Sequence, residues 1–133
     1  MPEAGNDFDG LKSIGQIAIT VKDLPGMTVF YRDVLGMPCL FEAPGMAFFD
    51  LSGVRLMLGT ATRPELEHPA SLLYYRVRDI EAAANALKSR GVSFENDPHP
   101  VHKTENQELW LAAFTDPEGN FLHLMCEKVI EAS

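Results

Sequence analysis

Short apolar stretches alternate with glycine, proline and aspartate along the chain, which is typical of a domain with many short strands. Residues 14–21 predict a first strand, and residues 25–35 predict a helix because apolar residues recur there at helical spacing. Asp23 is placed to cap the N-terminus of this helix, and Gly36 to end it. The remaining strands expected in the first half are 38–41, 46–50 and 54–58.

The second half of the chain predicts the same order of elements. Residues 72–77 form an apolar strand pattern, and Asp79 precedes an alanine-rich helix over 80–90 that Gly91 closes. Further strands are expected at 92–94, 108–114 and 121–126, and a polar, proline-bearing loop over residues 95–107. Each half therefore reads as a β-α-β-β-β unit.

The repeat is also visible in the residues themselves. The segment QIAITVKDL, from Gln16, aligns with LLYYRVRDI, from Leu72, at an offset of 56 residues. The segment DLSGVRLML, from Asp50, aligns with DPEGNFLHL, from Asp116, at an offset of 66 residues. The additional residues of the second half lie in the loop 95–107. Two matches in the same order indicate an internal duplication.

These patterns predict an α+β fold made of two tandem βαβββ units. We expect a flexible tail over residues 1–12 and one domain over 13–128, with unit 1 at 13–60 and unit 2 at 70–128. The helix of each unit covers one face of its sheet. The uncovered faces are expected to curve into a cup with the helices outside, and such a cup offers a cavity for a small molecule.

Charge and cysteine content narrow the range of partners. The net charge of −8 opposes binding to nucleic acid and to anionic membranes and slightly favours a cationic small molecule. The longest apolar run, Leu109–Phe114, is far too short to span a bilayer. The acidic N-terminus does not read as a signal peptide, and Cys39 and Cys126 lie in apolar strands, so we expect a cytoplasmic protein.

Two motifs carry a resemblance to a known family. The segment IAITVKDLPGMTVFYRDVLGM and the later segment FTDPEGNFLHLM resemble the opening strand and helix and the final hairpin of the glyoxalase / bleomycin-resistance / extradiol-dioxygenase superfamily, the vicinal oxygen chelate fold. The similarity covers about residues 13 to 127. It implies the two-unit cup and a homodimer. It leaves the activity open, because this superfamily includes lyases, epimerases, dioxygenases, thiol transferases and drug-binding proteins.

The resemblance also implies where a divalent metal would be held. In metal-using members, the ligands come from the first and last strands of each unit, and these positions correspond here to Gln16, Met57, Leu72 and His123. Leucine cannot bind a metal, and a thioether is a poor ligand for hard or borderline ions. Only Gln16 and His123 remain as metal ligands, so the standard four-ligand site is incomplete.

Other side chains on these strands are candidate ligand-binding groups. Either His123 is a core histidine bonded to a neighbour, such as Gln16, or it lines the cavity and binds ligand or moves a proton. Arg55 and Arg76 either hold an anionic group or lie in solvent. The aromatic residues suit either a cavity or an ordinary core. The full set of predicted ligand-binding residues is Gln16, Met57, Leu72, Tyr74, Arg55, Arg76, Trp110 and Phe121.

The inserted loop supplies an alternative set of chemical groups. His102 and Glu108, together with His123, could form a catalytic acid–base or metal set from non-standard positions, although solvated loop histidines are commoner. Three functions therefore stay open. The chain is a protein that binds an apolar or cationic small molecule, a metal-dependent lyase, isomerase or dioxygenase with a rearranged site, or an interaction module with a filled cup.

Overall fold

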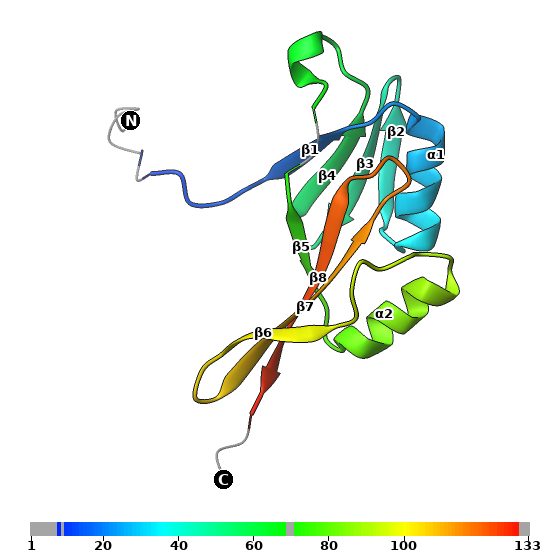
Figure 1. Cartoon of the computed structure of the whole chain (residues 1–133). Helices are drawn as coiled ribbons and strands as arrows, with labels where there is room; N and C mark the ends of the chain where they lie inside the picture. Colours follow the sequence, from blue (N-terminus) through cyan, green and yellow to red (C-terminus); the bar gives the residue numbers. More distant parts are fainter. Residues whose placement is uncertain (1–7, 9, 69–70, 131–133) are drawn as a thin grey trace.

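The computed structural model describes residue 8 and residues 10–68 and 71–130 (Figure 1). The expected tail over residues 1–12 lies mostly outside the described residues. Strand β1 (Gln16–Thr20) opens the first unit, and strand β8 (Phe121–Val129) closes the second. In the part of the chain that is described, no helix is long and apolar enough to cross a membrane.

The two units form two four-stranded sheets of the same topology. The first sheet contains β1, β2 (Cys39–Ala43), β3 (Met46–Leu51) and β4 (Val54–Gly59), in the order β1-β4-β3-β2. The second contains β5 (Leu73–Arg76), β6 (His99–Lys103), β7 (Gln107–Thr115) and β8, in the order β5-β8-β7-β6. The first strand of each unit runs parallel to the last, and the other neighbours are antiparallel. The predicted α+β duplication is confirmed.

Strand register confirms the alignment of the two units. Ala18 pairs with Met57 in the first sheet, and Tyr74 pairs with His123 in the second. These pairs are related by the same offsets of 56 and 66 residues that the sequence repeat predicts. The last strands of the two units therefore present Met57 and His123 at equivalent positions.

One helix connects the first two strands in each unit. Helix α1 (Leu24–Val29) continues into a π-helical segment, η2 (Phe30–Val34), and α2 covers Ile80–Ser89. As predicted, Asp23 and Asp79 cap the helices by accepting hydrogen bonds from backbone N–H groups at 3.1 and 3.0 Å. The linker between the units contains a 3-10 turn, η3 (Pro64–Leu66).

The structure corrects the prediction for the inserted loop. Residues 95–107 include the edge strand β6, whereas the strand expected at 92–94 is reduced to a single bridge between Phe94 and Phe114. Pro100 lies within β6, and the register with β7 shifts between Pro100 and His102. An edge strand tolerates a proline and a bulge of this kind, but both resemble loop signals in the sequence.

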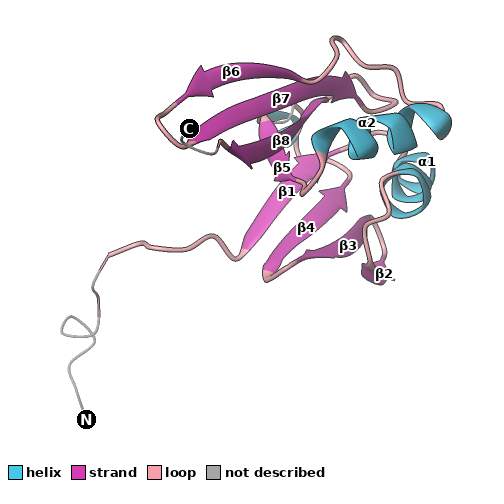
Figure 2. Ribbon diagram, turned by 90° about the horizontal axis from the view of Figure 1, so that it is seen from below, coloured by secondary structure: helices cyan, strands magenta, loops and turns pink. Residues whose placement is uncertain are grey.

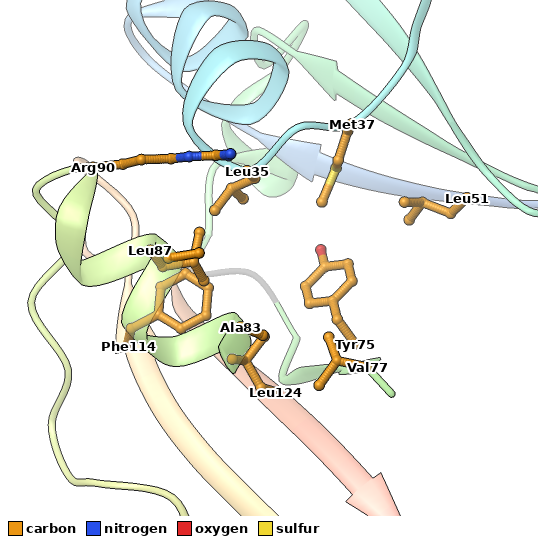
Figure 3. Close-up of a pocket in the computed structure, with 11 residues that line it drawn as sticks. Leu35, Met37, Leu51, Tyr75, Val77, Ala83, Leu87, Arg90, Phe114 and Leu124 are labelled. Carbon is orange, nitrogen blue, oxygen red and sulfur yellow. The ribbon is translucent and has the colours of Figure 1, made fainter. Parts of the chain in front are cut away.

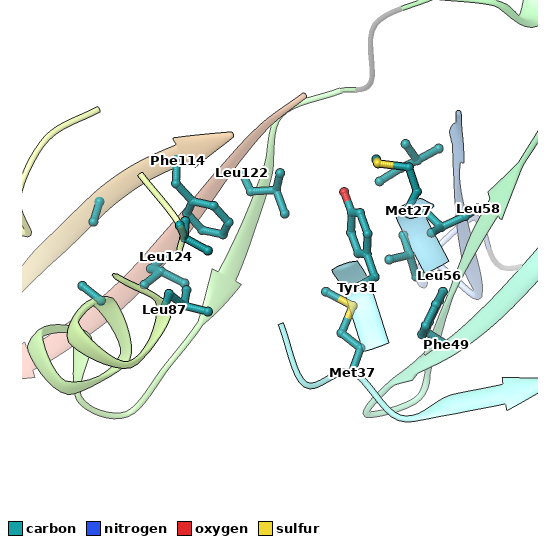
Figure 4. Packing of buried hydrophobic residues seen from close by; sticks show 14 of the residues in the cluster. Met27, Tyr31, Met37, Phe49, Leu56, Leu58, Leu87, Phe114, Leu122 and Leu124 are labelled. Carbon is teal, nitrogen blue, oxygen red and sulfur yellow. The ribbon is translucent and has the colours of Figure 1, made fainter. Parts of the chain in front are cut away.

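The helices of both units share one hydrophobic core (Figure 4). Tyr31, Phe49 and Leu56 of unit 1 and Phe114 and Leu122 of unit 2 belong to a single cluster, and each is at most 2% exposed. Helix α1 packs on β3 and β4, and α2 packs on β7 and β8. Figure 2 shows both helices between the two sheets.

Polar contacts also join the two units. The Tyr31 hydroxyl donates to Asp116 Oδ2 at 2.8 Å, and the Asp116 carboxylate is buried at the β7–β8 turn. Next to it, Glu118 accepts hydrogen bonds from the backbone N–H groups of Lys22 and Asp23, at the start of α1. Burial, reinforced by the Asp116 carboxylate, raises the pKa of Tyr31.

The packing determines where the uncovered sheet faces lie. Because both helices occupy the space between the sheets, the uncovered faces point outward from the shared core (Figure 2). Each unit is an open sheet with its helix behind it. The described residues of one chain do not bring the two open faces together into a cup.

Candidate functional site

The outward face of the first sheet carries a linked set of polar and aromatic side chains. Arg55 Nε donates to Gln16 Oε1 at 2.8 Å, and Gln16 Nε2 lies 3.9 Å from Met57 Sδ. The Arg55 guanidinium lies over the Phe48 ring at 5.3 Å, and Phe48 stacks on Phe41 at 4.4 Å. Strand alternation places these residues on one face because Gln16 and Arg55 are register partners.

Gln16 was expected either to ligate a metal or to bond to His123, and in the structure it has other partners. Its amide group contacts Arg55 and Met57 within its own sheet, rather than His123 of the other sheet. The side-chain oxygen, which is the atom that would ligate a metal, already accepts a hydrogen bond from a cation. The sequence could not reveal this pairing because it depends on the β1–β4 register.

A pocket of about 340 Å³ lies along the same face. Met57, Met46 and Ala18 contribute to its lining from three neighbouring strands, and Leu66 and His68 contribute from the linker. Thr20 Oγ1 donates to the Leu66 carbonyl at 2.8 Å, which holds the linker against the end of β1. Linker residues therefore form one wall of this pocket, a role that the sequence did not suggest.

The outward face of the second sheet is built around an aromatic pair. The Tyr74 and His123 rings are stacked, with centroids 4.4 Å apart and planes inclined by 22°. Phe121, on the same face of β8, is 47% exposed, as is Tyr74. His123 Nδ1 is buried and has no hydrogen-bond partner among the described residues. The half-exposed Tyr74 and Phe121 rings therefore form the aromatic surface of this face.

The remaining predicted residues of this face lie at its margins. Leu72 directly precedes β5 and is 58% exposed. Arg76 pairs with Glu127 at 3.4 Å, and the two side chains are 71% and 43% exposed. The surroundings of Arg76 favour the hypothesis that this side chain lies in solvent. Arg55, in contrast, has defined partners on its own sheet.

Two residues expected in the cavity lie on the opposite face of the second sheet. Trp110 Nε1 donates to Glu108 Oε1 at 3.2 Å, and Lys128 Nζ lies 3.8 Å from the Trp110 ring centroid. Lys128 also donates to Glu81 of α2 at 2.6 Å, so this cluster belongs to the helix-covered side. The apolar residues on both faces of β7 hid this orientation in the sequence.

The alternative catalytic set is consequently not brought together. Glu108 faces the helix side, whereas His123 faces outward. His102 is exposed on the edge strand β6, where it pairs with Leu109, and His123 pairs with Ala113 farther along β7. Within the described residues, no three His, Cys, Asp or Glu side chains cluster in a way that could hold a metal ion.

The donor atoms at the four superfamily positions do not fit a catalytic metal. Gln16 Oε1 is engaged by Arg55, Met57 offers only a thioether, and Leu72 has no donor. Of the four residues, only His123 has a nitrogen donor without a hydrogen-bond partner among the described residues, its Nδ1, and this atom is buried. One imidazole falls short of the three protein ligands that a catalytic zinc or iron site uses, so we derive no reaction step through a metal.

Comparison with known proteins agrees with this architecture. Residues 13–124 match the sequence profile of the Glyoxalase/Bleomycin resistance protein/Dioxygenase superfamily. Metallothiol transferase FosB from Staphylococcus haemolyticus is 28% identical over 120 residues, which cover 86% of this chain and 83% of that protein.

Solved structures show the same fold. TnmS3, an antibiotic binding protein from Streptomyces sp. CB03234, superposes with a TM-score of 0.74 at 21% identity over 91% of this chain and 100% of that one. Lactoylglutathione lyase from Agrobacterium tumefaciens superposes with a TM-score of 0.71 at 18% identity over 88% and 95% of the respective chains. At these identities, the likeness extends to the fold alone.

Proposed function

The chain belongs to the Glyoxalase/Bleomycin resistance protein/Dioxygenase superfamily, and from this we infer that it binds an apolar or cationic small molecule with an aromatic ring system. The ligand is held without chemical conversion, in a cup shared by two chains. Unit 1 of one chain supplies one wall, and unit 2 of a second chain supplies the other. Such a role resembles the antibiotic binding named for TnmS3 more than the transfer reaction named for FosB.

The Tyr74–His123 stack is the observation that carries this proposal. It places a half-exposed aromatic surface beside His123, one of the four positions at which the resemblance implies metal ligands. A planar ligand would continue the stack, because offset aromatic contacts contribute about 0.5–1.5 kcal/mol beyond area burial.

The wall from unit 1 complements this surface. Phe41 and Phe48 form a second stacked pair, and Met57 and Met46 line the adjoining pocket. Methionine side chains adapt to ligands of varied shape, as expected of a protein that binds a range of compounds. The net charge of −8 raises the local concentration of cationic ligands.

Two chains are needed because the open faces of one chain point apart. Phe41 is exposed on one open face, and Tyr74 and Phe121 are exposed on the other. Such apolar surfaces favour burial against a partner, and a two-fold contact closes them without forming a fibre. We therefore propose a homodimer. Cytoplasmic location is part of the same proposal, and the two cysteines, Cys39 and Cys126, are both free thiols.

A titration with two planar dyes tests the proposal. Full-length protein is titrated into ethidium and into the anion 1-anilinonaphthalene-8-sulfonate, and fluorescence anisotropy is recorded. We expect saturable binding with a preference for the cation, and both dyes recovered unchanged. Tyr74→Ala should weaken ethidium binding about tenfold, since it removes the stacking surface and its buried area. Absence of saturable binding, or equal affinity for ethidium in wild type and Tyr74→Ala, would refute the proposal.

A further inference from the structure

A second cavity lies between the two units, on the helix-covered side and away from the outward faces (Figure 3). Its volume is about 320 Å³. Unit 1 contributes the segment after η2 and the end of β3, through Met37 and Leu51, and unit 2 contributes β5 and α2. This cavity shares no lining residue with the pocket on the outward face of unit 1.

The walls of this inter-unit cavity are almost entirely apolar. Met37, Leu87 and Phe114 are core residues with at most 8% exposure, and Leu51 and Val77 are partly buried beside them. An apolar cavity of this kind gains little from water, because water needs two to four polar partners. A cavity of about 150 Å³ already accommodates benzene. The space therefore suits an organic molecule with one ring.

One polar atom is directed into the cavity. The Tyr75 hydroxyl is buried and has no hydrogen-bond partner among the described residues. Figure 3 shows its oxygen directed across the cavity toward Met37. A buried hydroxyl without a partner costs about 1–3 kcal/mol, and a ligand that carries one hydrogen-bonding group would recover part of this. Burial also raises the pKa of Tyr75 to about 12, so the hydroxyl stays protonated at neutral pH.

A hydrogen bond between the units involves one of the residues that line the cavity. Arg90, at the end of α2, donates from Nη1 to the Val34 carbonyl at 2.8 Å. Ala86 lines the cavity one turn earlier on α2 and is itself exposed. A ligand inside would touch both units at once, so its binding would stabilise their packing against each other.

We propose that this inter-unit cavity is a second ligand site, for a small neutral aromatic molecule with one hydroxyl or carbonyl group that bonds to Tyr75. The site is independent of the cup formed by the outward faces. Its occupant contacts Met37 and Leu51 on one side and Leu87 and Phe114 on the other.

The test compares 4-fluorophenol with 4-fluorotoluene by ¹⁹F NMR on the full-length protein. The two probes have nearly the same shape and differ in one hydroxyl. We expect wild type to bind both with Kd below about 1 mM. Tyr75→Phe should weaken 4-fluorophenol binding about five- to tenfold and leave 4-fluorotoluene within about twofold, since one neutral hydrogen bond is lost. Ala86→Phe, at an exposed helix position, should abolish binding of both.

Ala82→Phe is the matched control for Ala86→Phe, because it makes the same change at an exposed position of the same helix that does not line the cavity. It should leave both affinities unchanged. The proposal is overturned if neither probe binds wild type, if Tyr75→Phe affects both probes alike or neither, or if Ala86→Phe leaves binding intact.

Discussion

Tyr31 and Asp116 lie 85 residues apart in the chain, yet the Tyr31 hydroxyl donates a 2.8 Å hydrogen bond to the Asp116 carboxylate inside the shared core. The same carboxylate accepts backbone hydrogen bonds from Glu118 and Asn120 and a side-chain hydrogen bond from Asn120. The contact holds helix α1 of unit 1 against the β7–β8 turn of unit 2. It is one of the contacts that join the two units, together with the shared hydrophobic core.

Tyr31→Phe is expected to destabilise the fold by about 1.5–3 kcal/mol, because a buried hydrogen bond to a charged acceptor is lost without a change in volume. Urea unfolding followed by circular dichroism measures the loss. Tyr74→Phe, at a half-exposed position, should change the free energy of unfolding by less than about 0.5 kcal/mol. Equal effects of the two substitutions would mean that the Tyr31–Asp116 contact does not hold the units together.

Stability is expected to fall at alkaline pH through two tyrosines. Burial raises the pKa of Tyr75 to about 12 and, together with Asp116, raises that of Tyr31, whereas an unfolded tyrosine ionises near about 10. The unfolded chain therefore loses these protons first. The stabilisation is complete below about pH 10 and is lost as pH rises from there toward the folded-state pKa, by up to about 1.4 kcal/mol per pH unit for each tyrosine.

Urea unfolding at pH 8, 9.5 and 11 measures this dependence. The decline in the free energy of unfolding between pH 9.5 and 11 should be shallower in Tyr75→Phe than in wild type, because one of the two titrating groups is gone. Superimposable pH profiles would show that Tyr75 ionises equally readily in the folded and unfolded chains.

The proposed homodimer predicts a mass near twice 14.7 kDa by light scattering at micromolar concentration. Phe121→Glu, on the outward face, should shift the mass toward the monomer because it places a charge in the contact. Val29→Glu, on helix α1, is the matched control, since Val29 and Phe121 are both 47% exposed. A wild-type chain that stays at the monomer mass on concentrating contradicts the dimer.

The sequence predicted the order of strands and helices well because the same βαβββ pattern occurs in both halves of the chain. The repeat offsets anticipated that Met57 and His123 occupy equivalent positions, and the strand register bears this out. The helix caps at Asp23 and Asp79 were equally readable, since capping depends on a few neighbouring residues.

Features that depend on long-range packing could not be read in the same way. The stretch Leu109–Phe114 is apolar on both faces, so its alternation could not show that Trp110 points toward the helices. Pro100 made an edge strand look like a loop. The contact between Gln16 and Arg55 depends on the register of β1 and β4. The outward orientation of the open faces depends on the core that the two units share.

If the two open faces meet in the proposed dimer, substitutions on them should create a metal site. Met57→Glu together with Leu72→His would add a carboxylate and an imidazole to His123, which gives three good donors. We expect the double variant to bind Zn²⁺ at least about 100-fold more tightly than wild type in calorimetry, and each single variant to gain far less. No gain in the double variant would show that positions 57, 72 and 123 do not meet.

The most direct test of the shared cup is a mixing experiment with two damaged chains. Phe41→Ala removes an exposed ring from the unit 1 wall, and Tyr74→Ala removes one from the unit 2 wall. Each homodimer should bind ethidium weakly, since both of its cups carry one damaged wall. After the two variants are unfolded together and refolded, half of the dimers should be mixed, and each mixed dimer has one undamaged cup.

Anisotropy titration of the refolded mixture should therefore recover about one quarter of the wild-type binding sites at wild-type affinity. If the mixture instead binds no better than the average of its two components, the walls that bind the dye do not come from different chains, and the shared cup is contradicted.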